Sequence, residues 1–134
     1  MAYTNDKLTI QMIAAITLPH NVHAVPRELS DLDFVASVWK IYEERKMDAA
    51  EFIPYWRRNA SGTKGVYASV YRDAARTTAA VSTLTSKPQR AELDFGAGVK
   101  SACDLLSGER FSVVGGKVVG VFTPFRPYLL AVGR

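Results

Sequence analysis

The sequence predicts an α+β fold, in which N-terminal helices pack on a C-terminal antiparallel β-sandwich of about seven strands. Two observations support this prediction. Before about residue 60, apolar residues recur at spacings of three and four, which is the period of a helix. After about residue 65, short runs alternate apolar and polar residues, and turn-forming residues separate these runs. We therefore expect a helical segment over residues 1–60 and a β-sandwich over residues 61–134.

Two helices are expected in the first segment. Asn5 or Asp6 can cap the first one, and Pro19 ends it because proline has no N–H to donate to the preceding turn. The second helix is expected after Ser30, which is followed three residues later by Asp33 in a pattern similar to a capping box. Its apolar residues form a single stripe, consisting of Leu32, Val35, Val38, Trp39 and Tyr42.

Seven strands are expected in the second segment, over residues 65–73, 76–84, 90–95, 99–106, 110–114, 117–122 and 127–132. In the first of them Val66, Ala68 and Val70 alternate with bulkier or polar residues, so the two sets face opposite sides of the strand. The Gly115-Gly116 pair predicts a tight hairpin, because the favoured two-residue turn needs positive φ at its central residues.

The composition is typical of one globular domain. The chain has 134 residues, of which 48% are hydrophobic, and this is enough to build a core. Lysine and arginine number 17 against 13 acids, a formal net charge of +4, but no run of five like charges occurs, so a nucleic-acid partner is not expected. No apolar run reaches about 18 residues, so no membrane partner is expected. Asp6 and Gln11 interrupt the pattern of a signal peptide, which favours a cytoplasmic location.

Few residues form a pattern typical of catalysis. His20 and His23 are the two histidines, and their spacing is not that of a helical zinc pair, so neither a metal site nor a cofactor is expected. Glu92 and Asp94 are two residues apart and face the same side of one predicted strand. Paired carboxyl groups can act as acid and as base or nucleophile in glycoside hydrolysis. These four residues are the catalytic candidates. The alternative is that the two histidines lie in a linker and make ordinary hydrogen bonds, and that the two acids lie on a solvated strand face.

The segment EFIPYWRRN, residues 51–59, places four apolar and aromatic side chains next to two arginines. It lies where the helical segment meets the strands. One interpretation is that its rings pack the helices onto the sheet and fix the angle between the two layers. The other is that they form a platform on which a sugar or nucleotide stacks.

A family resemblance rests on four stretches that cover most of the chain, DLDFVASVWKIYEE, AAEFIPYWRRN, VYASVYRDAARTTAAVSTLTSKPQRAELDF and ACDLLSGERFSVVGGKVVGVFTPFRPYLLAV. From about Leu8 to Val132, the chain resembles the C-terminal region of bacterial TIM-barrel glycoside hydrolases, in which an antiparallel β-sandwich follows the barrel. The resemblance implies that residues 8–46 correspond to the last barrel helices. It implies no catalytic residue, because the catalytic carboxylates of that family lie on barrel strands that this chain does not contain.

Three functions are compatible with this resemblance. The first is a non-catalytic, carbohydrate-associated β-sandwich module that binds polysaccharide weakly, with Tyr55, Trp56, Tyr67 and Tyr71 as the candidate stacking residues. The second is a small glycoside hydrolase that acts as an oligomer, and the third is a structural or oligomerisation module. Helices that normally pack on a barrel would expose their apolar stripe here, so the stripe must be buried against this chain's own sheet or against a second copy. We expect a homo-oligomer, with carbohydrate as the other partner.

Overall fold

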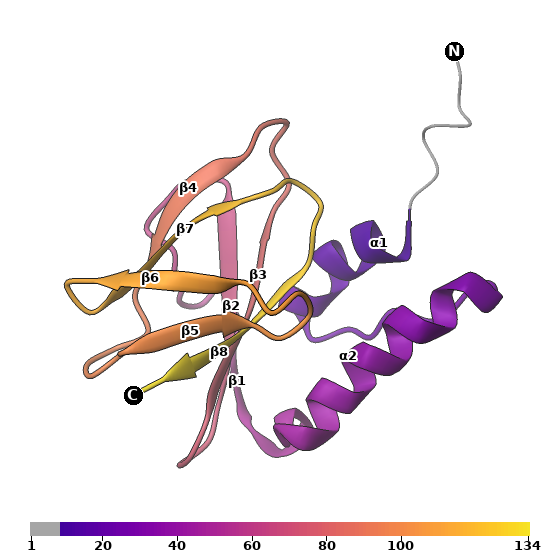
Figure 1. Cartoon of the computed structure of the whole chain (residues 1–134), viewed down its shortest axis with the longest axis horizontal. Coiled ribbons are helices and arrows are strands. Elements are labelled where there is room, and N and C mark those ends of the chain that lie inside the picture. The colour runs from indigo at the N-terminus through magenta and orange to yellow at the C-terminus, as the bar shows by residue number, and fades with distance from the viewer. Residues whose placement is uncertain (1–8) are drawn as a thin grey trace.

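The computed structural model describes residues 9–134 (Figure 1). This part of the chain contains two α-helices, α1 (Ile10–Thr17) and α2 (Leu32–Glu44), and three short 3₁₀ helices, η2 (Leu18–His20), η3 (Leu29–Asp31) and η4 (Met47–Ala49). Its eight strands are β1 (Glu51–Ile53), β2 (Val66–Arg72), β3 (Thr77–Thr83), β4 (Gln89–Leu93), β5 (Ser101–Asp104), β6 (Arg110–Val114), β7 (Lys117–Phe122) and β8 (Tyr128–Gly133). The predicted α+β class, with N-terminal helices against an antiparallel sheet, is confirmed.

The strands form one curled sheet rather than the predicted sandwich of two sheets. Their order is β1-β2-β3-β8-β5-β6-β7-β4, and every neighbouring pair is antiparallel. The sheet stays continuous because β8 pairs with β3 on one side and with β5 on the other. It curls until β4 meets the chain that leads into β2, where the Asp94 N–H donates to the Ala60 carbonyl at 2.8 Å and Ser61 forms a bridge with Leu93.

All seven predicted strands are present, and β1 is an additional one. β1 lies within residues 1–60, the part of the chain that was expected to be helical, and pairs with β2 through Phe52 and Tyr71. A strand of three residues is too short to show the alternation on which the prediction depended. The predicted hairpin is confirmed: β6 and β7 pair through Val114 and Lys117, and the two glycines between them have φ of 59° and 79°.

The helices begin differently from the prediction. Asn5 and Asp6 lie outside the described residues, and α1 is capped by Thr9, whose hydroxyl accepts a hydrogen bond from the Met12 N–H at 3.1 Å. α1 ends at Thr17, two residues before Pro19, as expected.

The predicted capping box at the start of α2 is wrong. The Ser30 hydroxyl donates to the Glu28 carboxylate, and Asp31 occupies the cap position without a side-chain capping bond. The carboxylate of Asp31 instead accepts from the backbone N–H and the Nε of Arg27, both at 3.0 Å, and these bonds lower its pKa.

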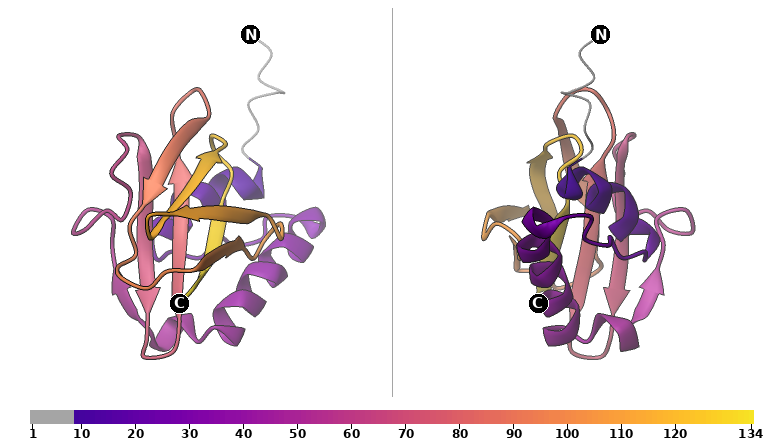
Figure 2. Two further views of the ribbon diagram at one scale, coloured as in Figure 1. Left: turned by 60° about the vertical axis from the view of Figure 1, so that its left-hand side comes forward. Right: turned by 90° about the vertical axis from the view of Figure 1, so that its right-hand side faces the viewer.

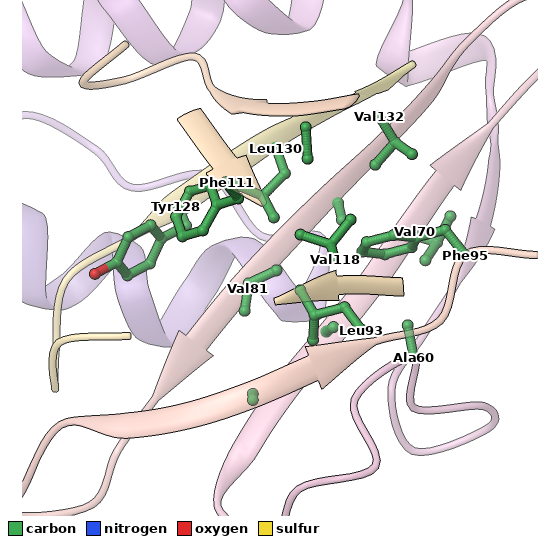
Figure 3. Close-up of a cluster of buried hydrophobic side chains, with 14 of the residues drawn as sticks. Ala60, Val70, Val81, Leu93, Phe95, Phe111, Val118, Tyr128, Leu130 and Val132 are labelled. Carbon is green, nitrogen blue, oxygen red and sulfur yellow. The ribbon is translucent and has the colours of Figure 1, made fainter. Parts of the chain in front are cut away.

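The sheet has a hydrophobic core on each of its two faces. The first core lies inside the curl, where Leu93, Val118 and Leu130 from β4, β7 and β8 meet (Figure 3). The second core lies on the outer face of β2, β3 and β8, which both helices cover (Figures 1 and 2). Because β3 has a core on each face, all of its residues are buried, although apolar and polar residues alternate only weakly in its sequence.

The apolar stripe of α2 is buried only in part. Val35, Val38 and Tyr42 are buried as expected, together with Ile41. Leu32 and Trp39, which were assigned to the same stripe, are 45% and 50% exposed. The stripe therefore contributes to the core along its centre and leaves two large apolar side chains at its edges in contact with solvent.

Asp104 at the end of β5 is a fully buried carboxylate that ties the sheet to the turn before β6. Its Oδ1 accepts from the backbone N–H groups of Leu129 at 3.0 Å and Leu106 at 3.3 Å. Its Oδ2 accepts from the Ser107 hydroxyl at 2.7 Å and lies 3.5 Å from Arg126. The turn that Asp104 holds connects β5 to β6.

No helix among residues 9–134 is long and apolar enough to cross a membrane.

Candidate functional site

The segment 51–59 is fixed to both layers of the fold by hydrogen bonds. The Tyr55 N–H donates to the Ser69 hydroxyl of β2 at 3.0 Å, and that hydroxyl donates to the Pro19 carbonyl of η2 at 2.6 Å. Downstream, the Asn59 side chain accepts from the Ala68 N–H and donates to the Val66 carbonyl, both at 3.0 Å. A short loop that is anchored at both ends holds its aromatic side chains in fixed positions.

Trp56 is the exposed member of this segment. Its indole is 60% exposed, and the His20 ring stacks on it with centroids 5.5 Å apart and an interplanar angle of 19°. Tyr55 and Phe52 contact it edge-on, at 5.2 Å and 6.1 Å between centroids. One indole face is thus supported by the protein, and the high exposed fraction means that much of the remaining ring surface is open to solvent.

His20 has a structural role in this cluster. Its Nδ1 lies 2.7 Å from the Ile16 carbonyl and its Nε2 lies 2.8 Å from the Tyr55 hydroxyl. A carbonyl oxygen can only accept, so the hydrogen-bond pattern assigns the ring proton to Nδ1, and Nε2 accepts from Tyr55. Both ring nitrogens are engaged with protein groups, which leaves neither free for a substrate.

Tyr55 and Tyr67 continue the aromatic surface from Trp56. Both are half-buried, and their ring centroids lie 4.8 Å apart. Trp56, Tyr55 and Tyr67 therefore form one connected group, which we call the aromatic platform.

Tyr71, the fourth predicted stacking residue, is not part of the accessible platform. It is 2% exposed beneath the helices, and its ring packs against Phe52 and Tyr42. Its hydroxyl accepts from the Tyr42 hydroxyl at 3.0 Å and lies 3.0 Å from the Leu18 carbonyl. Burial, together with the neighbouring Tyr42, raises the pKa of Tyr71 well above its usual value. Sequence alternation placed Tyr67 and Tyr71 on one face of β2, but it could not show that helices cover one end of that face.

Glu92 of β4 and Asp94, which directly follows that strand, are both exposed. They line a polar hollow of about 440 Å³ with Arg58 and Lys117. Two acids and two bases therefore share this surface, which is charge-balanced and has no aromatic lining.

The two histidines lie in different surroundings. His23 packs edge-on against Tyr42 with centroids 4.4 Å apart, and its Nε2 lies 4.0 Å from Asp48. It does not join His20 at the platform, and neither histidine lines the hollow around Glu92. Within residues 9–134 no group of three or more histidine, cysteine or acidic side chains has an arrangement suited to a metal ion.

No protein-family model matches the sequence, and no curated protein matches it. The fold is similar to part of an alpha-amylase from Anoxybacillus, described as a new glycosyl hydrolase subclass, with a TM-score of 0.65 and 16% identity over 79% of this chain. It is also similar to part of AmyP in complex with maltose, with a TM-score of 0.55 and 19% identity over 81% of this chain. The chain spans 23% and 22% of these two proteins. At such low identity the similarity concerns the fold, and at that level it confirms the resemblance to glycoside hydrolases.

Proposed function

We propose that this chain is a non-catalytic, carbohydrate-associated β-module, related to the C-terminal domain of TIM-barrel glycoside hydrolases, and that it binds polysaccharide weakly through the aromatic platform. The observation on which the proposal rests is Trp56, an indole 60% exposed and supported on one face by His20. Sugar rings present C–H faces that pack on aromatic planes, and a ring already held in place loses little conformational freedom on binding.

One feature of the platform favours a polysaccharide over a compact ligand, and one structural neighbour indicates which polysaccharide to test first. Trp56, Tyr55 and Tyr67 form a connected surface rather than an enclosed cavity, so they could contact successive units of a chain. The structural neighbour AmyP was solved with maltose, an α-glucan fragment, which makes insoluble α-glucans the first polysaccharides to test. Glu92 and Asp94 receive no catalytic role in this proposal, because both are exposed and the histidines lie elsewhere.

Replacing Trp56 by leucine is expected to lower retention on insoluble starch. Trp56→Phe should keep part of the retention, because phenylalanine, unlike leucine, still has an aromatic face on which a sugar can stack. Stacking of a nucleic-acid base on one aromatic ring is worth about 1–3 kcal/mol, and with the same range for a sugar ring leucine should weaken binding by about 5- to 150-fold. The measurement is depletion of the protein from solution by starch, cellulose, chitin and xylan. Val121→Ala, which alters another exposed apolar side chain, serves as the control.

The proposal fails if the wild-type chain is retained on none of these polysaccharides. It also fails if Trp56→Leu binds as well as the wild type, since adsorption would then not involve the platform. Near-ultraviolet circular dichroism of each variant separates a loss of binding from a loss of fold.

A structural or oligomerisation role is the second candidate, and one observation favours it. Four large apolar side chains between residues 22 and 32 are exposed: Val22, Val25, Leu29 and Leu32. Leu29 is 86% exposed, which is unusual for leucine, and burial of such residues against a second copy would be favourable.

We expect the chain to form a homo-oligomer through these residues. Light scattering after size-exclusion chromatography should give a mass above 14.7 kDa, and Leu29→Asp should shift the population towards the monomer, because a charge would be buried in the interface. Val114→Asp, at an exposed apolar residue of β6, is the matched control. A wild-type mass of 14.7 kDa at all concentrations would contradict this prediction.

A further inference from the structure

A second hollow, of about 280 Å³, lies on the helical layer beside the C-terminal half of α2. It is lined by His23, Trp39, Tyr42, Glu43 and Asp48, and we call it the acidic hollow. Trp39 is 50% exposed. A half-exposed tryptophan next to a depression has a flat face that a ligand can cover, and tryptophan is enriched where partners bind.

The accessible polar groups of the acidic hollow are mainly hydrogen-bond acceptors. Glu43 and Asp48 are carboxylates, which accept and do not donate when they are ionised. The hydroxyl of Tyr42 is engaged, because it donates to Tyr71 at 3.0 Å, so Tyr42 contributes only the edge of a buried ring. His23 packs against that ring and lies 4.0 Å from Asp48.

Among the described residues, the one basic group recorded next to either carboxylate is the His23 ring, whose Nε2 lies 4.0 Å from Asp48. Within residues 9–134, no lysine or arginine forms an ion pair with Glu43 or Asp48. The chain as a whole has a formal net charge of +4, so the hollow is a local negative site on a basic protein. Such a site attracts a cation more strongly than the surrounding surface does.

We propose that the acidic hollow binds the guanidinium group of an arginine side chain presented by a partner peptide or protein. A guanidinium has five N–H donors and no acceptor, which complements two carboxylates, and its flat, weakly hydrated plane stacks on indole. A saccharide fits this lining less well, because its hydroxyl groups need donors as well as acceptors. This inference goes beyond carbohydrate binding and does not depend on it.

The test is a titration with an end-blocked tri-arginine peptide, followed by the indole N–H signals of the ¹⁵N-labelled chain. The sequence has two tryptophans, so Trp56→Phe assigns both signals. Tri-arginine should shift the Trp39 signal in a saturable way, and the uncharged isosteric tri-citrulline should not shift it. Glu43→Gln and Asp48→Asn should each weaken binding about two- to fivefold, the range expected for an exposed ion pair.

Glu44→Gln is the matched control, because it removes the same charge one residue away and does not line the hollow. It should weaken binding of tri-arginine less than Glu43→Gln does, because Glu44 does not line the hollow. Trp39→Leu removes the reporting indole, so its binding is followed by the backbone N–H signals of Glu43 and Asp48. It should weaken binding about two- to fivefold through loss of the cation–π contact.

Three results of the tri-arginine titration would overturn the proposal. They are equal shifts with tri-arginine and tri-citrulline, shifts at Trp56 in place of Trp39, and equal effects of Glu43→Gln and Glu44→Gln. Saturable shifts of Trp39 with maltose but not with tri-arginine would also reject it in favour of a saccharide. The starch experiment on Trp56 is independent of each of these outcomes.

Discussion

Replacement of Asp104 by alanine is expected to lower the free energy of unfolding by about 3–5 kcal/mol, the cost typical of breaking a buried, hydrogen-bonded charge network. The side chain is fully buried and accepts from two backbone N–H groups and one hydroxyl. Alanine would leave the buried Leu129 N–H without an acceptor, and an unsatisfied buried donor adds its own desolvation cost. Arg126 would lose one of its two carboxylate partners and keep Glu109.

Urea unfolding followed by circular dichroism measures this effect. Asp104→Asn should cost less, about 1–3 kcal/mol, because one oxygen remains to accept from the backbone while the amide nitrogen faces donors. Glu92→Ala is the matched control: it removes an exposed acid from the edge strand β4 of the same sheet and should change stability by no more than about 0.5 kcal/mol. A loss for Asp104→Ala as small as that for Glu92→Ala would show that the network does not stabilise the fold.

The strands could be predicted because alternation and turn chemistry agreed along residues 65–134. The Gly115-Gly116 turn is the clearest case, since both residues have the positive φ that the hairpin requires. The way in which the strands join could not be predicted, because it depends on long-range pairing. β8 comes last in the chain and lies in the middle of the sheet, between β3 and β5, and this placement converts two expected sheets into one.

Some features of the candidate site could be predicted from the sequence, and others could not. The composition of residues 51–59 indicated an aromatic cluster between the two layers, and the structure places Phe52 at the seam and Trp56 in solvent. The interpretation as a packing seam therefore fits Phe52, and the interpretation as a stacking platform fits Trp56. Sequence spacing grouped His20 with His23, yet one supports Trp56 and the other packs on Tyr42. The chain turns between them, because Asn21 adopts a left-handed conformation after η2.

The residues that sequence reasoning overlooked are those whose role depends on burial. Asp104 was visible only as one acid among several, although it is the most buried of them. A signal was available: Asp104, Ser107 and Gly108 form the pattern of a side-chain-stabilised turn, in which the acid accepts from groups two and three residues ahead. No sequence pattern indicated the acidic hollow, because His23 and the lining residues between 39 and 48 come together only when the chain folds.

Tyr71→Ala is expected to detach the helices from the sheet and to lower the free energy of unfolding by about 3–5 kcal/mol, the range for removing a buried aromatic ring. Tyr71 lies at the centre of the outer core, packed on Phe52, and its hydroxyl links Tyr42 of α2 to Leu18 of η2. Thermal and urea unfolding measure the loss, and near-ultraviolet circular dichroism should show the release of the helices. A cost near zero would mean that the helices are held by other contacts.

Tyr71→Phe isolates the hydroxyl and should cost about 1–3 kcal/mol, whereas Tyr67→Phe, at a half-buried ring of the same strand, should cost less than about 0.5 kcal/mol. The pH dependence provides a second test. Burial raises the pKa of Tyr71 in the folded chain, while tyrosine in the unfolded chain ionises near about pH 10. The proton is therefore held more tightly by the folded state, so the contribution of Tyr71 is complete below about pH 10 and declines at higher pH. The stability of the wild type should fall more steeply than that of Tyr71→Phe above this pH, and parallel curves would contradict the assignment of a buried, protonated hydroxyl.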